Sequence, residues 1–172
     1  NGCPELAKEL IDIAASAGAD AIKFQSFIAD ELVSEGTEKA EYQKEDFSQE
    51  DQHSMLKKLE LSQDLHISLI EHCCSRGIEF MSTAFDKESL DFLIDNGMRR
   101  IKIPSGELTN HPLIRYIASK DMPIIMSTGM ASMDEIQEAL RVIEIERGDC
   151  GFEGSIGSIL TILHCTSNYP TQ

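Results

Sequence analysis

The residues best suited to chemistry lie together at the end of a short apolar segment, within 101–107. Lys102 stands between two isoleucines, so a strand here would point the lysine to the face opposite them. Pro104 cannot donate to a sheet and predicts the end of the strand, after which Ser105 and Glu107 supply a hydroxyl and a carboxylate. Because a buried lysine is costly unless its charge meets a partner, the pattern predicts a polar ligand site. The alternative is a lysine that reaches solvent beside an ordinary Ser-Gly turn.

A second lysine, Lys23, takes an equivalent position near the end of another apolar segment. If the two strand ends lie at the same edge of the fold, their two ammonium groups favour a multiply charged anion, most simply a phosphate together with a carboxylate. Hydroxyls of Thr83, Ser105 and Ser127 would donate hydrogen bonds, and helix N-termini after the strands would add positive field. Any single Ser or Thr could instead be a helix cap.

These residues must be positioned by alternating strands and helices. Apolar spacing and breakers predict strands at 20–25, 78–83, 99–103, 123–129 and 159–166. They predict helices at 1–19, 53–61, 62–77, 86–97, 110–118 and 136–145, with a turn at 148–157. Ser62, Asp86 and the pair Ser132 and Glu135 are expected to cap three of the helices.

Strict alternation predicts an α/β fold with a parallel sheet, either open and doubly wound or closed as a (β/α)8 TIM barrel. Polar groups end every predicted strand, which is typical of a barrel mouth. A dinucleotide-binding sheet is disfavoured because no Gly-x-Gly-x-x-Gly turn occurs. A barrel needs about 250 residues, and about five parallel strands are visible. We therefore expect 1–172 to be an incomplete segment, the central part of a TIM-barrel domain without its first and last strands.

Composition limits the partners. The 172 residues carry a net charge of -15, which argues against nucleic acid and against an anionic membrane surface. No apolar run approaches the ~20 residues of a membrane helix. The five cysteines form no Cys-x-x-Cys pair, so we expect reduced thiols and a cytoplasmic protein. Acids crowd the segment 30–51, which we expect to be mostly a solvated loop.

Five motifs together resemble the sialic acid (N-acetylneuraminate) synthase family, which includes legionaminate and pseudaminate synthases. They are ADAIKFQ (19–25), FMSTAFD (80–86), KIPSGELTN (102–110), IMSTGM (125–130) and HCTSNYP (164–170). The resemblance covers nearly the whole chain. It implies a TIM barrel that condenses phosphoenolpyruvate with an open-chain N-acylhexosamine to give a nonulosonic acid and phosphate.

The resemblance also implies roles for individual residues. Lys102 and Glu107 become the catalytic candidates. Residues at positions that hold phosphoenolpyruvate in the family are Lys23, Thr83, Lys102, Ser105 and Ser127. Glu107 and Tyr169 match positions near the sugar, and Gln25 and Ser167 are further substrate-binding candidates.

Other parts of the family's machinery are expected outside this segment. The resemblance implies a divalent metal, Mn or Mg, that polarises the sugar aldehyde. Its two histidine ligands would follow Gln172, and a general-base glutamate would precede Asn1. A C-terminal antifreeze-like domain and a homodimer are implied for the full-length enzyme, so the segment alone is expected to be inactive.

Two questions stay open at this point. The sugar could be N-acetylmannosamine, or the diacetamido-dideoxy hexose of a legionaminate synthase. Tyr42 and Gln43 in the acidic segment could read its substituents, and their surroundings favour neuraminate or legionaminate over pseudaminate. Alternatively, the chain is a non-catalytic barrel fragment that keeps an anion-binding module.

Overall fold

The structure is a computed structural model that describes residues 3–39 and 50–166. The helices are α1 (Pro4–Ser16), α2 (Ala29–Leu32), α3 (Gln52–Lys57), α4 (Gln63–Arg76), α5 (Lys87–Asp95), α6 (His111–Ala118) and α7 (Met133–Asp149). The strands are β1 (Ala21–Ser26), β2 (Glu79–Ala84), β3 (Ile101–Ile103), β4 (Ile124–Ser127) and β5 (Leu160–Leu163). Single 3-10 turns, η2 (Ser105–Glu107) and η3 (Ile156–Ser158), follow β3 and precede β5. None of the described helices is long and apolar enough to cross a membrane.

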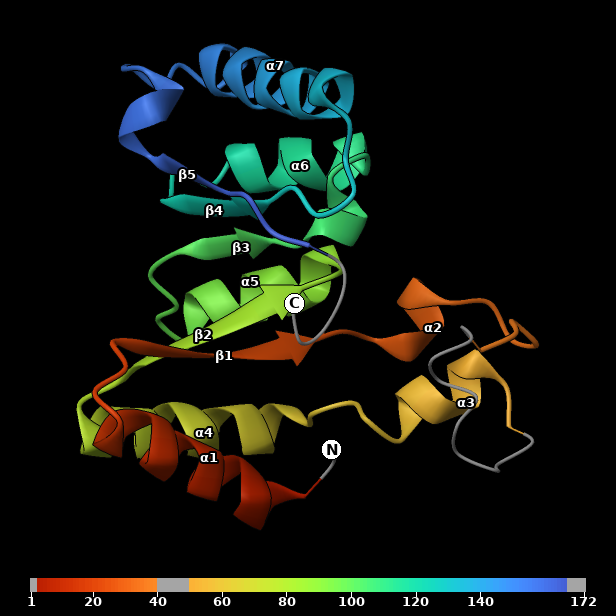
Figure 1. Cartoon of the computed structure of the whole chain (residues 1–172), viewed down its shortest axis with the longest axis vertical. Helices are drawn as coiled ribbons and strands as arrows, with labels where there is room; N and C mark the ends of the chain where they lie inside the picture. The colour runs from red at the N-terminus through yellow and green to blue at the C-terminus, as the bar shows by residue number, and fades with distance from the viewer. Residues whose placement is uncertain (1–2, 40–49, 167–172) are drawn as a thin grey trace.

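All strand pairings are parallel, as the alternation predicts. β1 pairs with β2, and β3, β4 and β5 form a second sheet in that order. β2 and β3, which are edge strands of the two sheets, lie side by side (Figure 1). Figure 1 shows α1 and α4 beside β1, and α6 and α7 beyond β4. The five strands thus form one layer whose outer side is covered by helices.

The core lies between the strands and this helical cover. Ile103 on β3 and Met126 on β4 are completely buried there, and they pair in the strand register. Leu90 of α5, Ile114 of α6 and Ile143 of α7 close over them and are also fully buried. Each such side chain contributes about 1.5–3 kcal/mol to folding. Because strand residues alternate between faces, this core obliges the residues between them to point the other way.

Helix caps are where sequence prediction and structure agree best. The side chains of Ser62 and Asp86 accept the backbone N–H groups of the third helical residues of α4 and α5. Ser132 and Glu135 form the expected reciprocal capping box at the start of α7. Gly77 ends α4 in the left-handed conformation with φ 69°, which favours glycine.

Several element boundaries differ from prediction. α1 covers Pro4–Ser16 and not 1–19, because Pro4 occupies its first turn and Gly18 turns the chain with φ 78°. α7 runs to Asp149, past both predicted ends, since buried Ala139, Ile143 and Arg147 keep helical spacing beyond the predicted stop. β5 ends at Leu163, so residues 164–166 follow the strand.

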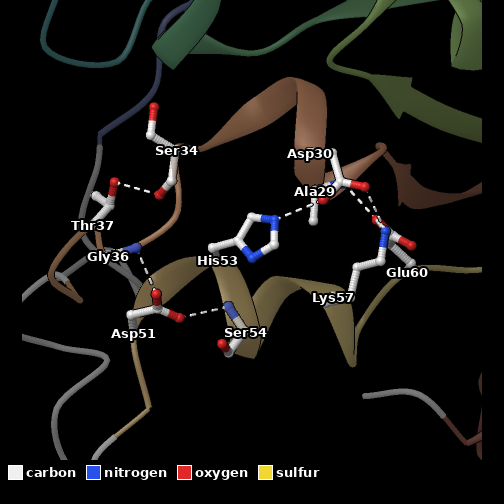
Figure 2. Close-up of polar contacts among 10 residues, drawn as sticks. All are labelled: Ala29, Asp30, Ser34, Gly36, Thr37, Asp51, His53, Ser54, Lys57 and Glu60. Atoms are coloured by element: carbon white, nitrogen blue, oxygen red, sulfur yellow. Dashed lines mark hydrogen bonds and ion pairs between the residues drawn. The ribbon is translucent and has the colours of Figure 1, made fainter.

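The prediction of a solvated loop for 30–51 is wrong at both ends. Asp30 lies in α2 and its two carboxylate oxygens contact His53 Nε2 at 2.8 Å and Lys57 Nζ at 2.9 Å (Figure 2). Asp51 caps α3 and accepts the Gly36 N–H at 2.6 Å. Asp30 therefore ties α2 to α3, and Asp51 ties α3 to the segment at Gly36, beyond the carboxyl end of β1 (Figure 1). Tyr42 and Gln43 lie outside the described residues.

Candidate functional site

The candidate site is the strand face opposite the core. On β1 and β2, Phe24 and Phe80 stack on the helix side with ring centroids 5.6 Å apart. The alternating residues Lys23, Gln25 and Thr83 therefore point to the other side, with Gln25 and Thr83 paired in register. The same alternation on the second sheet brings Lys102 and Ser127 to this face.

Lys102 is the centre of the site. It is only 8% exposed, and its Nζ donates to Ser127 Oγ at 2.6 Å and to the Ile103 carbonyl at 2.7 Å. Neither acceptor carries a formal charge. Burial is the main cause that lowers the pKa of Lys102 to about 8, and the positive charge of Lys23 contributes to this shift. The structure thus joins Lys102 to Ser127 and brings Lys23 within electrostatic reach, as the sequence predicts.

Lys23 differs from Lys102 in its surroundings. The residue as a whole is exposed, whereas Lys102 is buried, so the two lysines differ in burial although each lies on a strand of this face. Desolvation of part of the side chain still lowers the pKa of Lys23 below its usual value. The charge of Lys23 disfavours the ammonium form of Lys102, and a bound anion would relieve this repulsion.

Thr83 contributes a buried hydroxyl to this face. The residue is 1% exposed, and within the described part of the chain its Oγ1 has no hydrogen-bond partner. A buried hydroxyl without a partner costs free energy, so such atoms are rare in folded proteins. An anion oxygen on this face would give Thr83 the acceptor that it lacks.

Ser105 and Glu107 lie in the η2 turn directly after β3, where Pro104 ends the strand. Glu107 Oε2 accepts a hydrogen bond from Asn110 Nδ2 at 2.7 Å. Asn110 Oδ1 in turn accepts the Leu113 N–H at 3.2 Å and caps α6. The carboxylate is therefore engaged at the start of α6, and no contact joins it to Lys102 among the described interactions. Ser167 and Tyr169 lie outside the described residues.

Cys165 is a site residue that sequence reasoning missed. Its Sγ accepts the Gly129 N–H at 3.3 Å. That hydrogen bond is the main cause of a lowered pKa of the thiol, and the charge of Lys102 contributes in the same direction. Leu163 pairs with Ser127, and Cys165 follows Leu163 by two residues. This spacing is the signal that could have placed Cys165 on the same face.

A metal does not fit the described residues. Within 3–39 and 50–166, no group of three or more His, Cys, Asp or Glu side chains could hold an ion. The divalent metal expected for the full-length enzyme would therefore need ligands outside the described residues.

A family model described as the NeuB family matches residues 10–172. The chain belongs to the NeuB family. Two relatives are N,N'-diacetyllegionaminic acid synthases. The protein from Legionella pneumophila is 50% identical over 173 residues, and the one from Campylobacter jejuni is 47% identical over 171 residues. These alignments cover 100% and 99% of this chain but only 47% and 49% of the relatives.

A solved structure gives the same result for the fold. The N-acetylneuraminic acid synthetase from Leptospira borgpetersenii, crystallised in complex with citrate, superimposes with a TM-score of 0.78 at 28% identity. The match covers 98% of this chain and 51% of the synthetase. The predicted α/β class and TIM-barrel architecture are thereby confirmed for this NeuB-family chain, which spans about half the length of its relatives. These three relatives are synthases of N,N'-diacetyllegionaminic acid or of N-acetylneuraminic acid.

Proposed function

We propose that the full-length protein condenses phosphoenolpyruvate with an open-chain N-acylhexosamine to give a nonulosonic acid and phosphate. The observation that carries the proposal is Lys102, a buried ammonium group whose two acceptors among the described residues are uncharged and which lies within electrostatic reach of Lys23 in a NeuB-family chain. Such a pair suits a ligand with a carboxylate and a phosphate. We further propose that residues 1–172 form the central part of the synthase barrel.

The reaction makes one carbon–carbon bond and breaks one carbon–oxygen bond. C3 of phosphoenolpyruvate attacks the sugar aldehyde, whose oxygen takes up a proton. Water then adds to the cationic C2 and loses a proton, and phosphate leaves with the bridging oxygen to give the 2-keto group or its cyclic form.

Residues of this chain would hold the charged ends of phosphoenolpyruvate in place. Lys23 and Lys102 would neutralise the carboxylate and phosphate, and Thr83, Ser105 and Ser127 would donate hydrogen bonds. Preorganised donors are effective because they need no reorganisation as charge develops at C2. Glu107 would accept hydrogen bonds from sugar hydroxyls, away from the dianion that would repel it. Gln25, Ser167 and Tyr169 stay predicted substrate contacts.

The identity of the acceptor sugar is a further part of the proposal. The two legionaminic acid synthases match this chain at 50% and 47% identity, which favours a diacetamido-dideoxy hexose over N-acetylmannosamine as the acceptor. The divalent metal, the homodimer and the cytoplasmic location stay predictions for the full-length enzyme.

Product analysis with the full-length protein tests the proposal. Each hexosamine is incubated with phosphoenolpyruvate that carries ¹⁸O at the bridging oxygen, in the presence of Mn²⁺ or Mg²⁺. We expect a nonulosonic acid by mass spectrometry and ¹⁸O in the released phosphate. If the protein binds phosphoenolpyruvate but releases no phosphate from it in the presence of any of these sugars, the result would favour the anion-binding module. Label retained in the organic product would contradict the carbon–oxygen cleavage.

A further inference from the structure

Behind the candidate site, on the helix side of β1 and β2, lies a buried polar group formed by Ser26, Ser82 and His66. The three residues are 3%, 0% and 4% exposed. Ser26 Oγ lies 2.6 Å from His66 Nε2 and 2.7 Å from Ser82 Oγ. His66 projects from α4 and also packs edge-on against Phe92 of α5. One hydrogen-bonded chain therefore links two strands to a helix.

The donors and acceptors in this chain can be assigned from one contact. His66 Nδ1 lies 2.9 Å from the Ser62 carbonyl, which can only accept, so Nδ1 carries the hydrogen. Nε2 of the neutral ring then accepts from Ser26, and Ser26 accepts from Ser82. Burial also lowers the pKa of His66, which favours the neutral ring. The charged groups facing this region, Glu60 and Glu88, line an adjacent cavity of about 190 Å³.

The location of these hydrogen bonds connects them to the candidate site. Ser26 directly follows Gln25 on β1, and Ser82 directly precedes Thr83 on β2. Gln25 and Thr83 pair in register and point to the anion-binding face. The hydrogen bonds on the helix side therefore hold the same backbone segments whose other side presents the site.

We propose that Ser26, Ser82 and His66 form a relay that positions Gln25 and Thr83 for anion binding, with His66 as the Nδ1–H tautomer. The inference rests on the proposed function for its link to phosphoenolpyruvate. The relay touches no substrate, so its members are positioning residues. It acts by fixing the ends of β1 and β2 relative to α4.

Imidazole ¹⁵N NMR of the wild-type full-length protein tests the tautomer directly. We expect His66 to give the spectrum of a neutral ring protonated at Nδ1, at neutral pH and with or without phosphoenolpyruvate. A charged ring, or a ring protonated at Nε2, would overturn the assigned direction of the relay and with it the proposal.

Two substitutions of His66 separate the contacts of its two nitrogens. His66→Gln keeps an acceptor near the position of Nε2 and can still bind Ser26. His66→Asn keeps a donor to Ser62 but loses the acceptor for Ser26. His72→Asn is the matched control, because His72 lies on the same helix and contacts Asp12 at 2.8 Å instead.

We expect His66→Asn to raise the Kd for phosphoenolpyruvate by about three- to tenfold, the equivalent of one lost hydrogen bond. His66→Gln should restore most of the affinity, and His72→Asn should leave it unchanged. Equal affinity losses in His66→Asn and His66→Gln, or no loss in His66→Asn, would overturn the proposal. If His66→Asn does not fold, Ser82→Ala removes a single hydroxyl from the relay and is measured in its place.

Amide hydrogen exchange separates this inference from the proposed function. Exchange at Gln25 and Thr83 should be faster in His66→Asn and normal in His66→Gln, whether or not the protein binds phosphoenolpyruvate. A wild-type protein that binds no phosphoenolpyruvate would refute the proposed function alone. Unchanged exchange at these two amides in His66→Asn would refute the positioning role.

Discussion

Raising the pH should weaken phosphoenolpyruvate binding because it discharges Lys102. Burial, together with the charge of Lys23, lowers the pKa of this lysine to about 8 in the ligand-free protein. A bound dianion favours the ammonium form, so binding above this pKa requires the uptake of one proton. Between pH 7.5 and 9.5 the protonated fraction falls about 25-fold, and the Kd should rise by about the same factor. Lys23, whose pKa is also lowered, would add to the effect in the same direction.

Isothermal titration calorimetry of the full-length protein measures both the affinity and the proton uptake, when it is run in buffers of different ionisation enthalpy. Lys102→Arg is the informative variant, because a guanidinium group stays charged throughout this range. Its Kd should change much less with pH than that of the wild type. An affinity independent of pH in the wild type, or an equal pH dependence in Lys102→Arg, would refute the assignment of the titration to Lys102.

The stability of the ligand-free protein should respond with the opposite sign. The pKa of Lys102 is lower in the folded state than in the unfolded chain, so the unfolded chain binds more protons between pH 8 and 10.5. Stability therefore increases as the pH rises through this window. Between pH 7.5 and 9.5 the contribution of Lys102 is about 2 kcal/mol. Urea unfolding of the wild type and of Lys102→Met, which has no titrating amine, should differ in pH dependence by about this amount.

Further substitutions test the site and its supports. Lys102→Ala should weaken phosphoenolpyruvate binding by on the order of 2–3 kcal/mol, which corresponds to the loss of one contact to an ion. If the site needs both charges, Lys23→Ala should also weaken binding, but by less, because Lys23 is the more exposed of the two. Unchanged calorimetric affinity would remove the substituted lysine from the site. Glu107→Gln should weaken use of the hexosamine and leave phosphoenolpyruvate affinity nearly intact. If kinetics are unchanged and only thermal stability falls, the carboxylate serves the start of α6 through Asn110. Asp86→Ala should lower the free energy of unfolding by about 2 kcal/mol, since Asp86 caps α5 and also accepts the Ile28 N–H at 3.0 Å. Urea unfolding measures this loss, and a change below about 0.5 kcal/mol would show that the cap is dispensable.

Local features of the chain were predictable because their causes lie within a few residues. A proline that cannot donate ends β3 at Ile103, as Pro104 predicts. Alternation within that strand correctly separated Lys102 from its isoleucine neighbours. The capping residues of α4, α5 and α7 were correct for the same reason, since a cap bonds to an N–H three residues away.

Contacts between distant residues were decided only by the tertiary structure. The hydrogen bond from Lys102 to Ser127 spans 25 residues and depends on the parallel register of β3 and β4. That register also sets the burial that lowers the pKa of Lys102.

The polar contacts outside the site show the same limit. Ser26 and His66 are 40 residues apart, and nothing in their separate neighbourhoods marks them as partners. Asp30 looked like one charge of a solvated run until α3 supplied His53 and Lys57. Residue types and periodicity determine which elements form and which face each side chain takes. Which side chains then meet depends on how the elements pack, because a hydrogen bond requires donor and acceptor to approach within about 3 Å.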